Sequence, residues 1–592
     1  MTINRRDLLR GGGMAAAIAT AGIATADNAS AQPQAVHLPT KWDHEADVVV
    51  VGSGASGFPA AIRARESGSS VIIVEAQPHT GGHGTCSGGN VPLGGGTSRQ
   101  KKYGIVDSPD LYFRDLTDWS VVEGNGFPDY RYNDREIIRA FADHSPIVFE
   151  WLIKQGVVFV DKAPDTLGGG SVGESVPREN HAAVMNWPMV QTNAPAPAEK
   201  QATMSSGNGL IRPLEATAMK MGVKVLLEHK MIALHRQAPK SGRVLGIAVD
   251  NKGKLVHIRA RKGVILATGG SSSNVNFRRM FDPRLTEEYC GVAGQPWSDQ
   301  DASGELAAME IGASLWGGFN ETGEFGSGIT KPGHIGTQYG YVNLTWQPTS
   351  KVFDKARAIG LQVHDWQDVI LVNMIGKRFY DETAPQFTAG NYKTVDPYDP
   401  WSWRNVQNVK FSPHNWINAA LAGIGDAHNG GGPIWAIFDA DAVAREKWQV
   451  TPPHVDTTGF FFSGNSLAEL AGNIKMKYQR VPMPPQNLEE TVARYNGFVD
   501  KGVDDDFAKP KPLYKIAKPP FYAAWSTPVI HDTRAGLRIN PKGQVMDMNG
   551  RVIDGLYSCG ETAGGFSQHG LARATCQGYI AGENAAAEKI AT

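Results

Sequence analysis

The stretch that decides the fold is 47-DVVVVGSGASGFPAAIRARESGSSVIIVEA-76. A run of valines in residues 47–51 is typical of a strand that is buried on both faces in a parallel sheet. The glycines of 52-GSGASG-57 turn this strand into a helix predicted over residues 58–66. Residues 71–74 then form a second strand, which ends at Glu75. The stretch therefore predicts a strand–helix–strand unit.

This unit has the features of a dinucleotide site. Gly52, Gly54 and Gly57 form a G-x-G-x-x-G pattern, which lets a pyrophosphate sit on the first turn of the helix. Glu75 is placed to hold the hydroxyl groups of a ribose. A second glycine loop follows at 81-GGHGTCSGG-89, and a bare NAD site does not need one. The pattern leaves open whether the nucleotide is a substrate or a resident cofactor.

The composition sets broad limits on function. The chain has 592 residues, enough for two or three domains, and a net charge of -1, which does not suggest a binder of nucleic acids or membrane surfaces. Its 4 cysteines form neither a C-x-x-C nor a C-x-x-C-H pattern. We therefore expect no metal ion, haem or iron–sulfur centre.

The N-terminus has the pattern of an export signal. The segment 4-NRRDLL-9 is a twin-arginine pattern, and 29-ASA-31 is a suitable cleavage site. The Gly/Ala-rich run between them is too short to span a membrane. The sequence therefore predicts a signal peptide over residues 1–31, a periplasmic mature protein and no integral membrane segment.

Three later blocks complete the pattern. A strand runs into a tight turn at 263-GVILATGG-270, another strand precedes an acid at 555-GLYSCGE-561, and a helix is predicted over residues 572–589. In this order, the blocks resemble the FAD-dependent fumarate reductase and succinate dehydrogenase flavoprotein superfamily. It includes flavocytochrome c fumarate reductases, urocanate reductases and 3-ketosteroid dehydrogenases. The segments 375-IGKRF-379 and 570-GLAR-573 match as well, so that the resemblance extends from about Asp47 to Ala587.

The resemblance implies an α/β fold. A Rossmann-like FAD-binding domain of the glutathione-reductase type would be split between residues 43–290 and 525–592. An α+β cap domain would be inserted over residues 291–524. The active site would lie between the two domains, where enzymes commonly bind small molecules.

The resemblance also makes the nucleotide a resident FAD. Glu561 would hold the ribitol, and the backbone around Ala574 and Thr575 would face the pyrimidine end of the ring. His83 lies about one residue from the position at which succinate dehydrogenases join FAD covalently. Non-covalent binding is expected, and a covalent bond to His83 is the alternative. The cofactor-binding residues predicted in this way are Gly52, Gly54, Ala55, Ser56, Gly57, Glu75, Ala76, Gly82, His83, Thr85, Ser87, Gly88, Gly89, Met231, Ala267, Thr268, Gly269, Gly560, Glu561, Arg573, Ala574 and Thr575.

The chemistry implied by the resemblance is hydride transfer between flavin N5 and a carbon β to a carbonyl or carboxylate. A polar clamp would hold the carbonyl oxygen, where negative charge develops. Several fumarate reductase residues are replaced here. Gln347 stands where a histidine is expected, and the position of the arginine proton donor falls on Gln386, whose amide cannot act as a general acid. These departures argue against fumarate or a close analogue as the substrate.

Other catalytic positions match better. The segment 531-HDTRAG-536 resembles the H-T-x-G-G motif, which makes His531 a candidate acid, base or oxygen clamp. Arg573 matches a late arginine of the family and would clamp a carbonyl or carboxylate, while Arg534 could supply a second positive charge. Tyr392 lies near the donor position, where ketosteroid dehydrogenases place a tyrosine, but not at the matching offset.

We therefore expect an FAD-dependent enzyme that desaturates a bond beside the carbonyl of a bulky or cyclic ketone or acid. The aromatic residues of the predicted cap favour a bulky substrate. One alternative is the reduction of an unsaturated carboxylate by a relocated acid, and another is a non-catalytic flavoprotein. The electron partner would be external: a quinone, a cytochrome or oxygen. The cap aromatics are Tyr339, Tyr341, Trp346, Trp366, Trp401, Trp403, Trp416, Trp435 and Phe460 to Phe462.

Overall fold

The computed structural model describes most of the chain after residue 37. It covers residues 38–590 apart from 119–132, 166–174, 186, 188–189, 192–202, 282–285, 289–290, 293–294, 296, 317–328, 331, 340–344, 347–356, 380, 384–431, 528, 531–532 and 567–569. The predicted signal peptide lies outside the described residues. So do three of the predicted catalytic residues, Gln386, Tyr392 and His531.

The large sheet contains the predicted strand–helix–strand unit. Its strand order is β22 (Gln544–Met546), β23 (Val552–Ser558), β9 (Lys254–Leu266), β1 (His44–Val51), β2 (Val71–Val74) and β6 (Lys224–Leu226). Strands β8 (Ser241–Asn251) and β7 (Lys230–Ala238) extend the sheet from β9. Strand β1 (His44–Val51) pairs in parallel with β2 (Val71–Val74), from Val48 opposite Val71 to Val51 opposite Val74. On its other side, β1 pairs in parallel with β9 (Lys254–Leu266), which pairs with β23 (Val552–Ser558). Strands from both ends of the chain thus lie next to one another.

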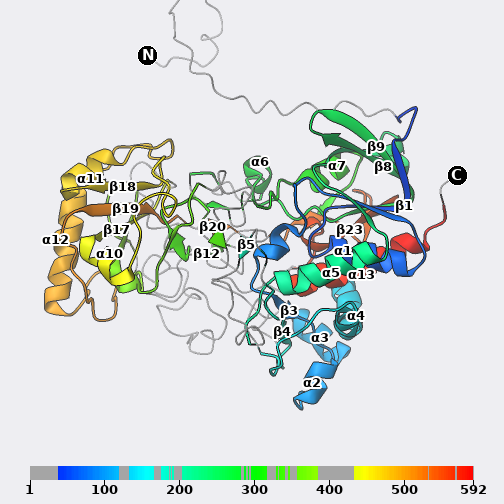
Figure 1. Cartoon of the computed structure of the whole chain (residues 1–592), viewed down its shortest axis with the longest axis horizontal. Coiled ribbons are helices and arrows are strands. Elements are labelled where there is room, and N and C mark those ends of the chain that lie inside the picture. Colours follow the sequence, from blue (N-terminus) through cyan, green and yellow to red (C-terminus); the bar gives the residue numbers. More distant parts are fainter. Residues whose placement is uncertain are drawn as a thin grey trace, which may run out of the picture. The chain divides into compact units, whose positions relative to one another are not determined.

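Helices α1 (Gly57–Glu66), α5 (Asn208–Lys220) and α13 (Leu571–Ala587) lie together beside this sheet (Figure 1). Small residues let α13 approach α1 closely. A Cβ atom at Gly578 would lie 2.2 Å from the carbonyl oxygen of Ser56, and one at Gly582 would lie 2.3 Å from that of Ala60. Only glycine fits such distances. The helices predicted over residues 58–66 and 572–589 are confirmed, with ends shifted by one or two residues.

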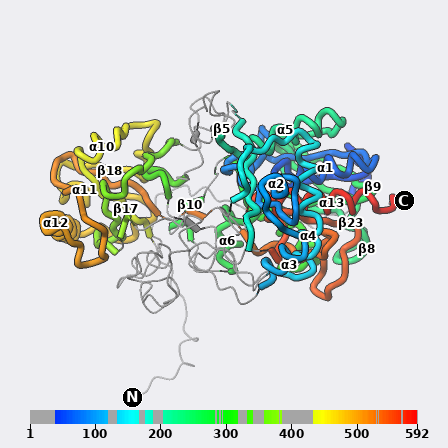
Figure 2. The backbone as a smooth tube through the Cα atoms, turned by 90° about the horizontal axis from the view of Figure 1, so that it is seen from below, coloured from blue at the N-terminus to red at the C-terminus, as the bar shows by residue number. Residues whose placement is uncertain are grey.

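A second, antiparallel sheet is built from later residues. Its order is β16 (Ile370–Val372), β17 (Trp435–Asp439), β19 (Phe521–Trp525) and β18 (Phe461–Gly464). Helices α11 (Leu467–Asn473) and α12 (Pro485–Lys501) pack with it (Figure 2). The predicted α/β fold with an additional α+β part is confirmed. The aromatic side chains of Trp435 and Phe461 pack in the hydrophobic cores of this part, so these two do not support the argument for a bulky substrate.

The remaining described elements complete the large sheet or lie outside the two sheets, and no described helix is long and apolar enough to cross a membrane. The helices are α2 (Ser98–Lys102), α3 (Pro109–Leu116), α4 (Arg135–Lys154), α6 (Val275–Arg278), α7 (Ser303–Glu310), α10 (Ala440–Glu446), η2 (Gly82–Cys86), η5 (Trp366–Asp368) and η8 (Gly560–Thr562). The strands are β3 (Asn90–Pro92), β4 (Glu179–His181), β5 (Val190–Gln191), β6 (Lys224–Leu226), β7 (Lys230–Ala238), β8 (Ser241–Asn251), β10 (Gly291–Val292), β11 (Leu315–Trp316), β12 (Ile329–Thr330), β13 (His334–Ile335), β14 (Thr345–Trp346), β15 (Leu361–Gln362), β20 (Val529–Ile530), β21 (Gly536–Leu537) and β22 (Gln544–Met546).

Candidate active site

A cavity of about 770 Å³ opens where β1, β2, β9 and β23 end. The carboxyl ends of parallel strands are where open α/β sheets bind their ligands, and the volume suits a cofactor. Most of the predicted cofactor-binding residues line it: Gly52, Gly54, Ala55, Ser56, Glu75, Ala76, Gly82, His83, Ser87, Gly88, Met231, Ala267, Thr268, Gly269, Gly560, Glu561, Arg573 and Ala574.

The first glycine loop forms a cradle of bare backbone. Gly52 has a φ of +104°, and a Cβ atom there would lie 2.2 Å from the carbonyl oxygen of Ala267. Gly54 faces open space, since the nearest atom to a Cβ built there is the carbonyl oxygen of Gly81 at 3.7 Å. A pyrophosphate can therefore approach the amide groups at the start of α1. The cradle fits the dinucleotide that the sequence predicts.

Four predicted cofactor-binding residues do not line the cavity: Gly57, Thr85, Gly89 and Thr575. Gly57 has a packing role, since a Cβ atom there would lie 2.0 Å from the carbonyl oxygen of Gly52. It lets α1 start directly against the turn that follows β1. The hydroxyl group of Thr575 donates to the carbonyl oxygen of Leu571 at 2.8 Å, within its own helix.

Glu75 is held in place at the end of β2. Its Oε2 atom accepts hydrogen bonds from the backbone amide of Ser53 at 3.0 Å and from its hydroxyl group at 2.6 Å. Its Oε1 atom accepts from the amide of Gln77 at 3.0 Å. Burial raises the pKa of the Glu75 carboxyl, and these hydrogen bonds oppose the shift. A fixed carboxylate at this point suits the predicted contact with a ribose.

Glu561 lies at the end of β23 and is held by a residue that the sequence did not single out. The Nε2 atom of Gln300 donates to Oε2 of Glu561, and the Oε1 atom of Gln300 accepts from the hydroxyl group of Ser272 at 2.8 Å. Gln300 belongs to a polar run, 298-SDQD-301, whose residues all line the cavity. The concentration of polar side chains in this run was the signal that could have found it.

Lys230 is a second residue that sequence reasoning missed. It lines the cavity, and its Nζ atom lies 2.6 Å from Oδ2 of Asp301. Burial lowers the pKa of the Lys230 ammonium group, but the neighbouring Asp301 carboxylate outweighs it, so that the pKa is raised. The group is therefore a stable cation at the edge of the cavity.

His83 lies in η2 with its Nδ1 atom 3.2 Å from the hydroxyl oxygen of Ser298. It lines the cavity, as a residue in contact with the cofactor must. A covalent bond from His83 stays a prediction. Acid denaturation tests it, because flavin that is not covalently bound passes entirely into the supernatant.

Two buried arginines, Arg573 on α13 and Arg534, line the same cavity. The guanidinium group of Arg573 donates to the carbonyl oxygen of Thr533 at 3.2 Å from Nη1 and to that of Ala563 from Nη2. Gly270 allows this arrangement, because a Cβ atom there would lie 1.7 Å from Oγ1 of Thr533. The two predicted clamp residues are thus brought to one cavity.

The cavity has further polar residues that the sequence did not indicate: Asn90, Lys162, His181 and Ser205. Asn90 and His181 lie opposite each other in the β3–β4 pair. No local motif marks these residues, because strand pairing over a long sequence separation brings them to the cavity.

Comparison with known families decides the identity of the cofactor. The model of a family described as "FAD binding domain" matches residues 47–316 and 340–575. The chain belongs to this FAD binding domain family. The predicted resident FAD is confirmed. The residues at Gly52 to Ser56, Glu75, Gly82 to Gly84, Ser87 to Gly88 and Gly560 to Glu561 fit it, and bound FAD supplies or accepts hydride.

Several relatives in the family are enzymes. The chain is 27% identical to a 3-oxosteroid 1-dehydrogenase of Mycolicibacterium smegmatis, over 88% of this chain and 92% of the relative. It is 25% identical to an acrylate reductase flavoprotein subunit of Shewanella woodyi, over 96% of this chain and 94% of the relative. It is 27% identical to a fumarate reductase (cytochrome) of Shewanella frigidimarina, over 89% of this chain and 73% of the relative. The protein is an FAD-dependent oxidoreductase that acts on CH–CH groups.

Solved structures agree with the fold. An open flavocytochrome c3 fumarate reductase matches with a TM-score of 0.58 and 23% identity, over 92% of this chain and 79% of that chain. A 3-ketosteroid Δ1-dehydrogenase from Sterolibacterium denitrificans also matches with a TM-score of 0.58, at 20% identity, over 92% and 100%. Both relatives therefore share the fold with this member of the FAD binding domain family.

Proposed function

We propose that the protein desaturates the carbon–carbon bond beside the carbonyl or carboxylate group of a cyclic or otherwise bulky substrate. The observation that carries the proposal is the pair of buried arginines, Arg534 and Arg573, in the FAD cavity. Guanidinium groups hold a carbonyl or carboxylate oxygen where negative charge develops during removal of the neighbouring proton. The similarity to a 3-oxosteroid 1-dehydrogenase supports a cyclic substrate.

The replacement at the donor position supports the oxidative direction. Gln386 stands where the reductases of this superfamily have their arginine proton donor, and a carboxamide does not transfer protons at neutral pH. Removal of a proton by a base and of a hydride by FAD is then the favoured use of the cavity. The electrons would leave to an external quinone, cytochrome or oxygen.

The first experiment is anaerobic mixing of the oxidised FAD-loaded protein with saturated cyclic ketones and ring carboxylic acids. The flavin band near ~450 nm, which oxidised isoalloxazine carries, is followed over time. Rapid bleaching by one of these classes is the expected result and identifies the substrate family. If every member leaves the band unchanged, the proposed desaturation is wrong.

A second candidate function is the reduction of an unsaturated carboxylate. Arg534 favours it, since two cations suit a carboxylate better than a neutral ketone. The similarity to an acrylate reductase flavoprotein subunit agrees with it. In that case, chemically reduced protein would be reoxidised rapidly by unsaturated acids under anaerobic conditions, and saturated acids would not bleach the oxidised protein.

We propose in addition that residues 1–31 direct export of the folded protein to the periplasm, as the twin-arginine pattern at Arg5 and Arg6 indicates. Cell fractionation and the mass of the mature chain test this. A mature N-terminus at Gln32 is expected, and replacing both arginines by lysine would keep the chain in the cytoplasm.

A further inference from the structure

A strand pair at the edge of the cavity carries a histidine that has no role so far. His181, the last residue of β4, lies opposite Asn90 of β3, and both residues line the cavity. Residues opposite each other in an antiparallel pair point to the same face. A Cβ atom at Gly570, directly before α13, would lie 3.8 Å from the carbonyl oxygen of Asn90. Asn90, the strand partner of His181, therefore lies beside the start of the helix that carries Arg573.

One ring nitrogen of His181 is bound to a carboxylate. Its Nε2 atom lies 3.0 Å from Oδ2 of Asp165, and Nζ of Lys162 lies 2.9 Å from the same oxygen. A carboxylate only accepts, so in the neutral ring Nε2 carries the hydrogen and Nδ1 carries the lone pair. Nδ1 has no hydrogen-bond partner among the described residues. This is the arrangement of a base whose tautomer a carboxylate fixes.

The backbone fixes this pair on both sides. The amide of Asp165 donates to the carbonyl oxygen of Glu179 at 3.1 Å, and the amide of Glu179 donates to the carbonyl oxygen of Asp165 at 2.9 Å. The amide of Val160 donates to the carbonyl oxygen of His181 at 2.8 Å. Strand β4 is thus held between β3 and the segment that carries Asp165, and the His181–Asp165 distance does not depend on the side chains alone.

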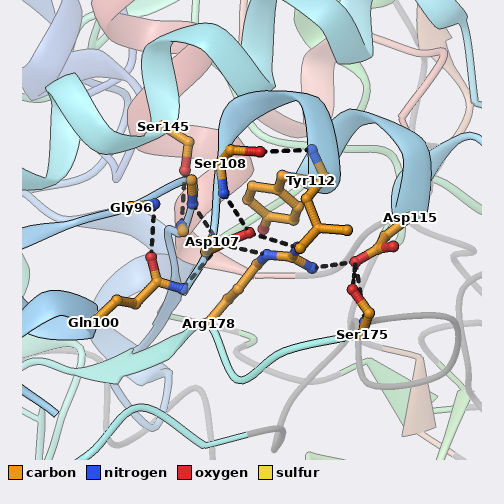
Figure 3. Close-up of polar contacts among 12 residues, drawn as sticks. Gly96, Gln100, Asp107, Ser108, Tyr112, Asp115, Ser145, Ser175 and Arg178 are labelled. Atoms are coloured by element: carbon orange, nitrogen blue, oxygen red, sulfur yellow. Dashed lines mark hydrogen bonds and ion pairs between the residues drawn. The ribbon is translucent and has the colours of Figure 1, made fainter. Parts of the chain in front are cut away.

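A buried ion network anchors the start of β4 (Figure 3). Arg178 precedes the strand and is fully buried. Its guanidinium group contacts both carboxylate oxygens of Asp107 at 2.9 Å, and its Nη1 atom lies 2.8 Å from Oδ2 of Asp115. The ring of Tyr112 packs against it, with the guanidinium carbon 4.2 Å from the ring centre. Such a network gives the strand one position.

We propose that His181 is the residue that exchanges the substrate proton with the cavity, and that Asp165 is its positioning residue. The inference rests on the proposed desaturation. The substrate loses a proton from the carbon α to its carbonyl and a hydride from the β carbon, and a C=C bond forms. Nδ1 of His181 takes the proton and later releases it to water. Bound FAD would accept the hydride, and the two electrons would leave to the external quinone, cytochrome or oxygen.

The charges around His181 agree with this role. Asp165 and Lys162 face it from the preceding segment, Glu179 from its own strand with Oε1 4.0 Å from Nε2, and β3 contributes the uncharged Asn90. The spacing of Asp165, Glu179 and His181 would also admit a metal ion. The ammonium group of Lys162 on the shared Asp165 oxygen opposes a second cation there, which favours the proton-transfer role.

The test uses the FAD-loaded protein and its variants His181→Asn and Asp165→Asn. His364→Gln is the matched control, because it removes a histidine from a carboxylate pair, 2.7 Å from Glu446, that does not line the cavity. His181→Asn is expected to slow flavin reduction by substrate about 100-fold and to change the pH profile of that rate. Asp165→Asn is expected to slow it about 10-fold, and His364→Gln less than 2-fold.

A second readout needs no substrate. The visible spectrum of bound FAD is titrated with pH, and the wild type and His364→Gln are expected to show a transition that His181→Asn lacks. An unchanged rate and pH profile in His181→Asn overturns the proposal, as does a stoichiometric metal ion that His181→Asn loses. If no substrate bleaches the flavin of the wild type, the proposed desaturation is wrong, whatever the spectrum shows. If the spectrum of the wild type has no pH-dependent transition, the proposed role of His181 is wrong. If the His181→Asn protein does not fold, the rate and the spectrum of Asp165→Asn are used to test the proposal instead.

Discussion

The guanidinium group of Arg573 donates a hydrogen bond to the carbonyl oxygen of Thr533 at 3.2 Å, and Thr533 is the residue directly before Arg534. This bond ties the first turn of α13 to the loop that carries the second arginine. A shift of one cation therefore displaces the other. The two residues form one oxygen-binding unit rather than two independent charges.

Arg573→Lys tests this unit. Lysine keeps the positive charge but cannot reach both backbone carbonyl groups and the substrate with one ammonium group. We expect flavin reduction by substrate to slow about 100-fold, as when one donor to a developing oxyanion is lost, with FAD still bound. Stopped-flow rates and the FAD-to-protein ratio measure both effects. Arg494→Lys, an exposed residue paired with Asp506, is the control, and a loss of less than 3-fold in Arg573→Lys would contradict the prediction.

Gly57→Ala tests the close contact between α1 and the first glycine turn. The new methyl group would lie 2.0 Å from the carbonyl oxygen of Gly52. We expect α1 to move, the free energy of unfolding to fall by about 3 kcal/mol and FAD to be lost. The control is Gly497→Ala within α12, where nothing lies within 4 Å and helix propensity favours alanine by about 1 kcal/mol. Urea denaturation measures the free energy of unfolding, and the FAD-to-protein ratio measures the loss of the cofactor. A fully FAD-loaded Gly57→Ala protein would contradict this account.

Arg178→Met tests the buried ion network. It leaves the carboxylates of Asp107 and Asp115 buried without their cation, and we expect a loss of about 3–5 kcal/mol in the free energy of unfolding. The solvent-accessible Arg139, which pairs with Asp110 and Asp143, is the matched comparison, and Arg139→Met should cost less than about 1 kcal/mol. Equal effects of the two substitutions would show that burial of the network adds nothing.

His235 makes stability depend on pH. It is fully buried on β7, with its Nε2 atom 3.0 Å from Nδ1 of His257. Burial, with a smaller effect of His257, lowers its pKa from 6.5 to about 4. Below pH 6.5 His235 becomes protonated in the unfolded chain, whereas in the folded protein it stays neutral down to about pH 4. Its contribution to the free energy of unfolding is therefore fully present above pH 6.5 and is lost as the pH falls from 6.5 to 4.

His235→Asn should flatten this part of the stability curve, measured by urea denaturation at a series of pH values. A remaining slope is expected, because burial also lowers the pKa of His334 to about 4. The control is His454→Asn, which removes a half-buried histidine in place of the fully buried one. The same slope in His235→Asn and in the wild type would rule out the contribution of His235.

The sequence was sufficient for the elements whose signals are local. The valines of β1 and the glycines at 52, 54 and 57 specify backbone geometry within a few residues, so the strand and its turn into α1 could be predicted. His181 could not, because its partner Asp165 and its neighbour Asn90 meet it only through strand pairing. The same holds for Gln300, which reaches Glu561 across the sheet end. Long-range pairing leaves no pattern in a single sequence.

The pairing of β23 with β9 also has a consequence for the newly made protein. The ribosome synthesises β1, β2 and β9 before it reaches β23 (Val552–Ser558) and α13 (Leu571–Ala587). Until then β9 lacks its partner strand β23 at Val264 to Leu266, and the cavity lacks Glu561, Arg573 and Ala574. The FAD site is therefore complete only after β23 and α13 have been synthesised and have packed against the earlier strands, which makes the site depend on contacts between segments far apart in the sequence.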